Sequence, residues 1–299
     1  MGWRHIMITK KSQLSVRYNQ LVITQEDKVS IPLEDIASIL IEDNSVTITA
    51  YTLSKFSDYN IGLVTCNEKH LPNGILTSFQ KHTRHAKVLQ TQYNLSKPFR
   101  KRIWQKIIMS KIMNQAKCLE ILEKDGYKEI SSICKTIESG DATNREAYAA
   151  QLYFKYLFGT KFTRRTENTY NHSLNYGYSI IRGMVARTLV NYGFTPSLGI
   201  KHHNELNNFN LADDFMEVLR PIVDLFVATH IDCFTEFNIE IRKDLYNILN
   251  YEIQIECKHY SIQQAIEVMV KSYVSACRTE NYRSIKLPNL IKLRMHSYE

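Results

Sequence analysis

The chain has 299 residues, of which 44 % are hydrophobic and 23 % charged, a composition typical of a folded protein rather than a disordered one. Its 38 Lys and Arg exceed its 30 Asp and Glu, and the resulting net charge of +8 favours a polyanionic partner. No apolar run approaches the length of a membrane span and the start lacks an apolar signal core, so we expect a cytoplasmic protein without a membrane partner.

Residues 12–78 are predicted to form strands with one helix. Apolar and polar residues alternate in "QLSVRYNQLVI", with a tight turn expected at Asn19-Gln20. The segments "IASILIE" and "SVTITAY" have the same β-branched character. A short helix is expected in "TLSKFSDYN", followed by the strands "IGLVTC" and "GILTS". The sequence therefore predicts a small β-rich N-terminal domain over residues 1–80.

A one-sided basic stretch follows, because no acidic residue occurs between Glu68 and Glu120. Its eleven cations are Lys69, Lys81, Arg84, Lys87, Lys97, Arg100, Lys101, Arg102, Lys106, Lys111 and Lys117, with His82 and His85 among them. Such a stretch favours nucleic acid, the commonest polyanion in cytoplasm, over the alternative of a solvated basic helix without a partner. We assign residues 81–98 to a basic linker and first helix region.

From about residue 99 the apolar residues recur at three- and four-residue steps, which predicts one long amphipathic helix. Ser96 and Pro98 are its expected start signals and Gly126 its expected stop. Further helices fit 144–158, 173–191, 211–228, 238–251 and 261–278. We therefore predict an α+β protein of two domains, the small β-rich domain followed by a larger, all-helical C-terminal domain over residues 99–299.

The segment "GIKHHNELNNFNLADDFMEVLRP" has the residue types of a metal site. Asp214 and Glu217 are three residues apart on a predicted helix and share a face, and His202 or His203 lies in the preceding loop. Carboxylates with one imidazole suit Mg²⁺ or Mn²⁺ better than structural zinc, which favours Cys and His. The six scattered cysteines, without a C-x-x-C pair, agree with that choice.

Glu146 is the expected carboxylate from a separate element. It stands among small and apolar residues in "REAYAAQLYF", where a buried charge needs a cation or a partner. The alternative is an ion pair with an arginine, for which Arg182 and Arg187 are the candidates. The residues alone leave both interpretations open.

Four segments recur in a known order and spacing: "EAYAAQLYF" from Glu146, "NHSLNYGYSIIRGMVARTL", "GIKH" and "LADDFMEVLRP". In these segments the chain resembles the Cas-one family, the integrase and endonuclease of CRISPR adaptation, and most closely its type II branch. The resemblance covers essentially the whole chain. It implies a β-rich N-terminal domain and a larger helical C-terminal domain, as the patterns predict.

The resemblance also implies which residues carry the chemistry. Glu146, His202 and Glu217 fall on the family's catalytic metal ligands, with Asp214 as an auxiliary carboxylate. Lys201 replaces a residue that is often apolar in the family, which leaves open whether His202 or His203 faces the ion. The residues expected to support the ligands or to contact DNA are Asn175, Tyr176, Tyr178, Arg182, Arg164, Arg165, Lys101 and Arg102.

The implied activity is strand transfer, in which 3′-hydroxyls of a short DNA duplex attack phosphodiesters at the ends of a CRISPR repeat. The implied partners are double-stranded DNA, a second copy in a homodimer joined largely through the β domains, and a dimer of the small Cas-two protein. Type II systems add Cas-nine and the ring-forming Csn-two. Two alternatives stay open: a metal-dependent nuclease of branched DNA that uses water as nucleophile, and a non-catalytic DNA-binding scaffold.

Overall fold

The computed structural model describes residues 2–76, 83–232 and 234–298. The described residues divide into two compact units, one up to Thr83 together with Tyr298, and one from Arg84 to Ser297. Lys81 and His82, at the start of the predicted basic linker, lie outside the described residues. The rest of that predicted linker contains the helix α2 (His85–Tyr93), which belongs to the second unit.

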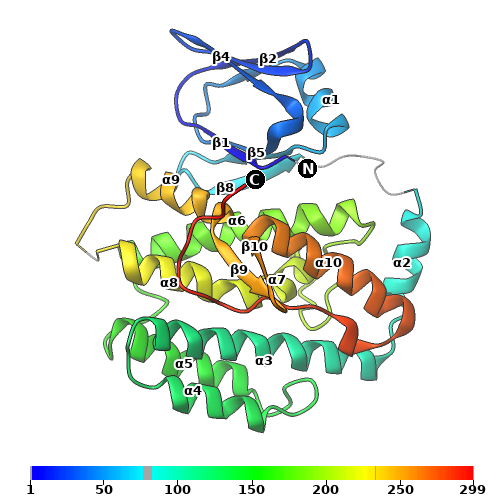
Figure 1. The fold of residues 1–299 in the computed structure, drawn as a ribbon, viewed down its shortest axis with the longest axis vertical. Helices are drawn as coiled ribbons and strands as arrows, with labels where there is room; N and C mark the ends of the chain where they lie inside the picture. The colour runs from blue at the N-terminus through cyan, green and yellow to red at the C-terminus, as the bar shows by residue number, and fades with distance from the viewer. Residues whose placement is uncertain (1, 77–82, 233, 299) are drawn as a thin grey trace. The chain divides into compact units, whose positions relative to one another are not determined.

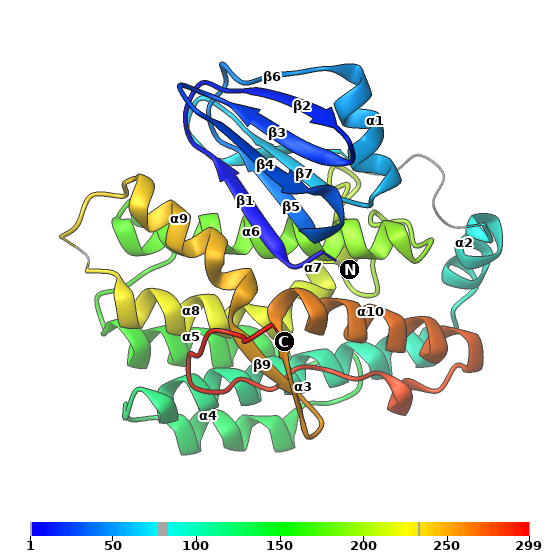
Figure 2. The ribbon, with the colours of Figure 1, turned by 45° about the horizontal axis from the view of Figure 1, so that its top comes forward.

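The described part of the first unit contains two four-stranded sheets and one α-helix (Figure 2). The strand order of one sheet is β1-β5-β7-β8, formed by Arg4–Ile8, Ile36–Ile41, Gly62–Cys66 and Pro72–Leu76. The order of the other is β4-β3-β2-β6, formed by Lys28–Pro32, Gln20–Thr24, Gln13–Arg17 and Thr47–Ile48. Helix α1 (Ala50–Asp58) connects β6 to β7.

The core of the first unit lies between the inner faces of these sheets. Leu14 of β2 and Leu21 of β3 are fully buried, as is Ile39 of β5 in the other sheet. The hairpin turn between β2 and β3 lies at Tyr18-Asn19, one residue before the predicted position, because both residues have positive φ and Gln20 already pairs with Arg17. The alternation of apolar and polar residues thus predicted both strands, whereas the pairing register of β2 with β3 depends on the geometry of the turn.

The second unit is mostly helical. Its α-helices after α2 are α3 (Lys97–Ile121), α4 (Tyr127–Ile133), α5 (Arg145–Phe158), α6 (Thr169–Asn191), α7 (Asn210–Met216), α8 (Arg220–His230), α9 (Ile239–Asn247) and α10 (Ile262–Thr279). The short 3-10 turn η3 (Glu217–Leu219) joins α7 to α8. Figure 1 shows α3 running alongside α4 and α5. None of the helices in the described residues has the length and apolar character needed to cross a bilayer.

The prediction of an all-helical second domain is wrong at one place. Strands β9 (Glu252–Ile255) and β10 (Lys258–Ser261) form an antiparallel hairpin there. Glu252, Ile253 and Ile255 of β9 are buried, and Gln254 is more exposed, so the strand is buried on the side of its two isoleucines and partly on the other. Both units therefore contain α-helices and β-strands.

The long helix α3 begins where the sequence indicates and ends earlier. The Ser96 hydroxyl caps it by accepting a hydrogen bond from the backbone N–H of Phe99, and Pro98 lies in its first turn. The helix ends at Ile121, before Gly126. Gly126, with a φ of 85°, instead precedes α4, so the glycine serves the start of the next helix rather than the end of this one.

The C-terminal segment packs back onto the second unit. The Asn114 side chain on α3 donates hydrogen bonds to the carbonyls of Val218 in η3 and Pro288, at 2.9 and 3.0 Å, and accepts one from the backbone N–H of Leu290 at 2.9 Å. Gln254 of β9 exchanges two backbone hydrogen bonds with Asn289. This buried asparagine therefore joins α3, η3 and the end of the chain.

Candidate metal centre

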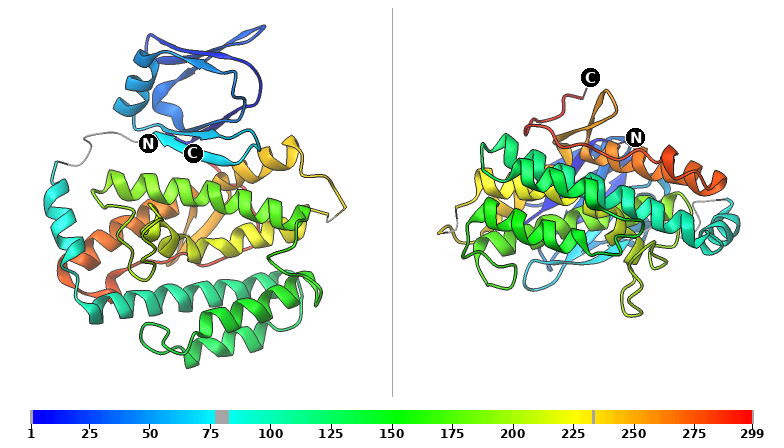
Figure 3. Two further views of the ribbon diagram at one scale, coloured as in Figure 1. Left: turned by 180° about the vertical axis from the view of Figure 1, so that it is seen from behind. Right: turned by 90° about the horizontal axis from the view of Figure 1, so that it is seen from below.

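Three elements of the second unit bring the predicted carboxylates and histidine together: the start of α5, the turn η3, and the loop between α6 and α7. Figure 3 shows that loop lying between the long helices α6 and α3. Glu146 lies in the first turn of α5. The buried Asp141 side chain caps this turn, because its carboxylate accepts hydrogen bonds from the backbone N–H groups of Arg145 and Glu146 at 2.8 and 3.1 Å. Asp141 thereby fixes the backbone from which Glu146 projects.

The Lys111 ammonium on α3 joins the two predicted glutamate ligands. Its Nζ donates a hydrogen bond to Glu146 Oε1 at 2.6 Å and forms an ion pair with Glu217 Oε2. The side chains of Lys111 and Glu217 are only 7 % and 5 % exposed, whereas that of Glu146 is 27 % exposed. Glu146 was expected to pair with Arg182 or Arg187 if it paired at all, and its partner is instead this lysine.

The charges in this cluster keep one another ionised. Burial acts to lower the pKa of Lys111, but the charges of Glu217 and Glu146 outweigh it and raise that pKa above its ordinary value. Burial likewise acts to raise the pKa of Glu217, but Lys111 and Arg220 hold it below its usual range. Arg220 contributes through an ion pair of 3.0 Å between its Nε and Glu217 Oε1. Lys111 and Glu217 are therefore both charged near neutral pH.

Asp214, which is fully buried on α7, holds the loop that carries the histidine. One carboxylate oxygen accepts hydrogen bonds from the backbone N–H groups of Ile200 and Lys201, at 2.5 and 3.1 Å. The other accepts from the backbone N–H of His202 at 3.2 Å and from its ring Nδ1 at 2.7 Å. This last hydrogen bond raises the pKa of His202. Asp214 is therefore placed to orient His202, which agrees with the expected role of an auxiliary carboxylate that supports the ligands.

Among the described residues, no three or more His, Cys, Asp or Glu side chains are arranged closely enough to hold a metal ion. The donor set still fits a hard divalent cation, because two carboxylates from separate elements converge on one positive group. His202 lies near enough for its charge to lower the pKa of Glu217. With Nδ1 held by Asp214, the ring would bind a metal through Nε2, the arrangement in which a carboxylate supports a ligand histidine.

Arg164 is fixed in place beside this cluster. Its guanidinium donates to the side-chain oxygens of Asn171 and Asn175 at 2.5 and 2.6 Å, and it lies over the rings of Phe154 and Tyr178. Asn175 is exposed at this point, and Arg164 is half-buried. The pair therefore presents fixed polar groups at the surface of the second unit.

Arg182 joins α6 to the start of α7. It contacts both carboxylate oxygens of Asp213, at 2.7 and 2.9 Å, and donates to Asn207 at 2.8 Å. Its guanidinium lies 4.8 Å from the centre of the Phe209 ring. Arg182 therefore supports the loop that precedes α7.

Tyr178 belongs to a buried network behind Glu217. Its hydroxyl and that of Tyr153 both donate hydrogen bonds to Asp224, the second at 3.1 Å. Burial raises the pKa of Asp224 to about 6. The Tyr178 ring also lies 4.8 Å from the guanidinium of Arg220, the arginine that pairs with Glu217. Tyr178 therefore supports the site from the core.

Tyr176 does not face outward as a DNA contact would. Its side chain is fully buried, and its ring packs edge-on against Phe237 at 5.8 Å. By contrast, Arg165, Lys101 and Arg102 are exposed, as a phosphate-binding role requires. Tyr176 is therefore a core residue, so of the two expected roles its burial argues against a DNA contact and leaves the supporting role as a prediction.

The basic stretch is not one continuous charged surface. Lys111 is buried in the carboxylate cluster, and Lys106 donates hydrogen bonds to the carbonyls of Arg283 and Ile285. Arg100 donates to the carbonyl of Tyr93. The cations that remain exposed among the described residues are Lys69, Arg84, Lys87, Lys97, Lys101, Arg102 and Lys117. Of the basic stretch, only these exposed side chains are therefore available to bind a polyanion among the described residues.

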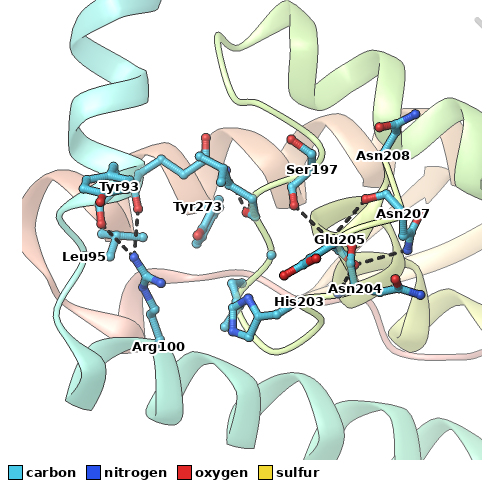
Figure 4. A pocket seen from close by; sticks show the side chains of 15 residues that line it. Tyr93, Leu95, Arg100, Ser197, His203, Asn204, Glu205, Asn207, Asn208 and Tyr273 are labelled. Atoms are coloured by element: carbon cyan, nitrogen blue, oxygen red, sulfur yellow. Dashed lines mark hydrogen bonds between the residues drawn. The ribbon is translucent and has the colours of Figure 1, made fainter.

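A pocket of about 340 Å³ lies on one side of the histidine loop, and His203 lines it. In Figure 4, Arg100 extends from α3 toward the end of α2, and Asn204 and Asn207 belong to the loop at the other side of the pocket. The Asn210 side chain donates hydrogen bonds to the carbonyls of Ser197, Asn204 and Asn207. His202 is therefore anchored to Asp214, while His203 is exposed toward this pocket.

Sequence reasoning missed three residues of the site: Lys111, Arg220 and Asp141. Lys111 carried a usable signal, because it is four residues after Ile107 and three after Ile108 and so falls on the apolar face of α3. A lysine at such a position predicts a buried partner of opposite charge. Asp141 carried no comparable signal, because its capping role depends on a loop geometry that residue spacing does not fix.

A family model described as "CRISPR associated protein Cas1" matches residues 6–235 of this chain. The chain is 41 % identical over 304 aligned residues to the "CRISPR-associated endonuclease Cas1" of Neisseria meningitidis serogroup C (strain 8013). That alignment covers all of both chains.

Solved structures with the same fold are also found. A "Casposase bound to integration product" has a TM-score of 0.76 at 18 % identity, with 93 % of this chain and 92 % of that chain covered. A "Cas6-RT-Cas1--Cas2 complex" has a TM-score of 0.72 at 17 % identity, and the match covers 97 % of this chain and 36 % of that longer chain. At these identities the likeness shows a shared fold.

Proposed function

The chain belongs to the Cas1 family of CRISPR-associated proteins, and from that membership we propose that it is a metal-dependent DNA integrase and endonuclease of CRISPR adaptation. Its reaction joins the 3′-hydroxyl ends of a short DNA duplex to the ends of a CRISPR repeat by transesterification. One phosphodiester bond forms as another breaks, so the exchange needs no nucleotide hydrolysis.

The observation that carries this proposal is the meeting of Glu146 and Glu217 on one cation, with His202 oriented beside them by Asp214. We assign Glu146, Glu217 and His202 as ligands of Mg²⁺ or Mn²⁺. A divalent ion at such a centre withdraws electron density from a phosphodiester and stabilises charge on the attacking and leaving oxygens. Arg220 keeps Glu217 ionised and in place, and Asp141 holds the backbone of Glu146.

DNA is proposed to contact the exposed cations of the second unit. Arg165, Lys101 and Arg102 are exposed, and the half-buried Arg164 beside them in this proposal is held by hydrogen bonds to two asparagines. Because captured DNA has no fixed sequence, most contacts are expected with phosphates rather than with base edges. Asn175 positions Arg164 for such contacts through its hydrogen bond.

The matches to a casposase with an integration product and to a complex that contains Cas1 and Cas2 support DNA and Cas2 as partners, and the family resemblance adds that Cas2 takes part as a dimer. Homodimerisation through the β-rich first unit, and the participation of Cas-nine and Csn-two, are further parts of the proposal that follow from the family resemblance. The proposed division into a β-rich dimerisation domain over residues 1–80, a linker over 81–98 and a catalytic domain over 99–299 belongs to the same proposal.

The test combines this protein, its Cas2 partner, a short duplex with free 3′-hydroxyls and a plasmid carrying the CRISPR repeat. We expect joined strands in Mg²⁺ or Mn²⁺, none in EDTA and none when the duplex ends in 3′-deoxynucleotides. Glu217→Gln should abolish joining, and Glu205→Gln, which changes an exposed carboxylate of the neighbouring loop, should leave it intact. Cut plasmid without joined strands would instead indicate a nuclease, and no exchange at all would indicate a DNA-binding scaffold.

A further inference from the structure

Lys111 is a lysine in an apolar environment. It lies on α3 beside Ile107, Ile108 and Ile112, which are fully buried, and its own side chain is 7 % exposed. A lysine ammonium is seldom buried to this extent unless it is paired. The physical question is therefore what keeps this charge inside the protein.

The answer is the pair of carboxylates already assigned as metal ligands. Glu146 on α5 and Glu217 in η3 both contact Lys111. A single ammonium therefore bridges two glutamates that are 71 residues apart in the sequence. Without a cation between them, the two carboxylates would repel each other. The Lys111 ammonium between them instead attracts both carboxylates, so the two side chains lie close together in the metal-free protein.

An ammonium and a divalent cation compete for this position. Both bind through the oxygen lone pairs of the same two carboxylates, and their like charges repel at short range. Arg220 remains paired with the other oxygen of Glu217 and does not occupy the position between the glutamates. The competition therefore concerns Lys111 alone among the cations that contact Glu146 and Glu217 in the described residues.

We propose that Lys111 is a positioning residue that acts as a built-in cation: it holds Glu146 and Glu217 together in the metal-free protein and gives way when a divalent ion binds. This inference rests on the proposed function, because it takes Glu146 and Glu217 to be metal ligands. It adds that the metal centre is assembled by exchange of one cation for another rather than by filling an open site.

The test measures Mn²⁺ binding by the paramagnetic resonance signal of free Mn²⁺, with no DNA present. Lys111→Met removes the competing charge at similar volume, so we expect it to bind Mn²⁺ at least tenfold more tightly than the wild type. Its melting temperature in EDTA should fall, because two carboxylates lose their shared cation, and saturating Mn²⁺ should restore it. Lys117→Met, which changes an exposed lysine of the same helix that pairs with Glu120, is the matched control and should alter neither quantity.

Two further variants keep the inference falsifiable. Lys111→Gln, which keeps a hydrogen-bond donor, should also bind Mn²⁺ more tightly and replaces Lys111→Met if that variant does not fold. Glu217→Gln should lose Mn²⁺ binding. If the wild type binds Mn²⁺ and both Lys111 variants bind it no more tightly, the exchange of cations is refuted while the proposed function stands. If the wild type binds no Mn²⁺, the metal-dependent function itself fails, and this inference with it.

Discussion

The carboxylate of Asp214 holds both the backbone N–H and the ring Nδ1 of His202, and with the backbone N–H groups of residues 200 and 201 it accepts four hydrogen bonds in all. One side chain thus sets the course of the loop and the orientation of the imidazole. A ligand histidine commonly depends on such a carboxylate, because the partner of one ring nitrogen fixes the direction of the other.

Asp214→Asn should destabilise the metal-free protein. The backbone N–H groups of residues 200–202 donate to this buried carboxylate and would lose a charged acceptor. We expect this loss to lower the free energy of unfolding by about 3 kcal/mol. Urea denaturation in EDTA measures this loss, with Glu205→Gln as an exposed control. If stability in EDTA were unchanged and only the stabilisation by Mn²⁺ disappeared, Asp214 would be a metal ligand after all.

His202→Ala should stop strand transfer, and His203→Ala should change it by less than about threefold. His202 is anchored to Asp214 and lies close enough to lower the pKa of Glu217, whereas His203 lines the pocket of Figure 4. Initial rates of joining measure the difference, and melting curves confirm that both variants fold. Loss of joining in His203→Ala with normal joining in His202→Ala would reverse the assignment.

Glu146→Gln should reduce strand transfer by about a hundredfold or more, because charge stabilisation acts in the transition state. The sequence alone suggested that removing this carboxylate could raise the stability of the metal-free protein. The ion pair with Lys111 argues for a small loss instead, of about 1 kcal/mol, since Glu217 continues to pair with the lysine. Thermal melts in EDTA, run beside the joining assay, decide between a gain and a loss.

Replacing both Lys101 and Arg102 by Ala should weaken DNA binding and reduce its dependence on salt. Two exposed cations that neutralise phosphates contribute about 2 to the slope of log affinity against log salt. Titration of a duplex between roughly 50 and 200 mM salt measures that slope. The Lys106→Ala variant is the matched comparison, because that ammonium is engaged by two carbonyls and should change the slope little. If the wild type, the double variant and Lys106→Ala all had the same slope, the DNA would not bind at Lys101 and Arg102.

Asp224 should make stability fall as pH rises through the weakly acidic range. Burial raises its pKa from 3.8 to about 6, so between these values the folded state holds a proton that the unfolded state has lost. That linkage lowers the free energy of unfolding as pH increases, by about 3 kcal/mol across the window. Asp224→Asn lacks the titrating group, so its stability relative to the wild type should increase from pH 4 to pH 6 and then stay level. Parallel curves for the two proteins would contradict the shift.

The sequence predicted more of the ligand set than of its support. The spacing and the resemblance predicted Glu146, His202 and Glu217 as ligands, and the structure places both glutamates on Lys111 with His202 close enough to lower the pKa of Glu217. Lys111 was counted as a surface cation, although its position on the apolar face of α3 indicated burial. Charge counting treats every lysine alike, whereas burial depends on the side of the helix on which each one lies.

Features that depend on distant contacts could not be predicted from local pattern. The β9–β10 hairpin was read as helix or loop because only two isoleucines, Ile253 and Ile255, mark its buried side. The roles of Asp214 and Asp141 depend on loops whose path residue spacing does not define. Tyr176 was expected to support the ligands or to contact DNA because it lies in "LNYGYSIIR", a segment that resembles the family, but a resemblance of segments does not indicate that this side chain is fully buried.

The hydrogen bonds of Asn114 have a consequence for how the protein is made. Asn114 supports Val218, next to Glu217, yet it receives the backbone N–H of Leu290 only 176 residues later in the chain. Synthesis proceeds from the N-terminus, so α3 and η3 are translated before the segment that completes the contacts of Asn114. A nascent chain on the ribosome therefore lacks these contacts of Asn114, next to the metal centre, until Pro288 and Leu290 have been synthesised.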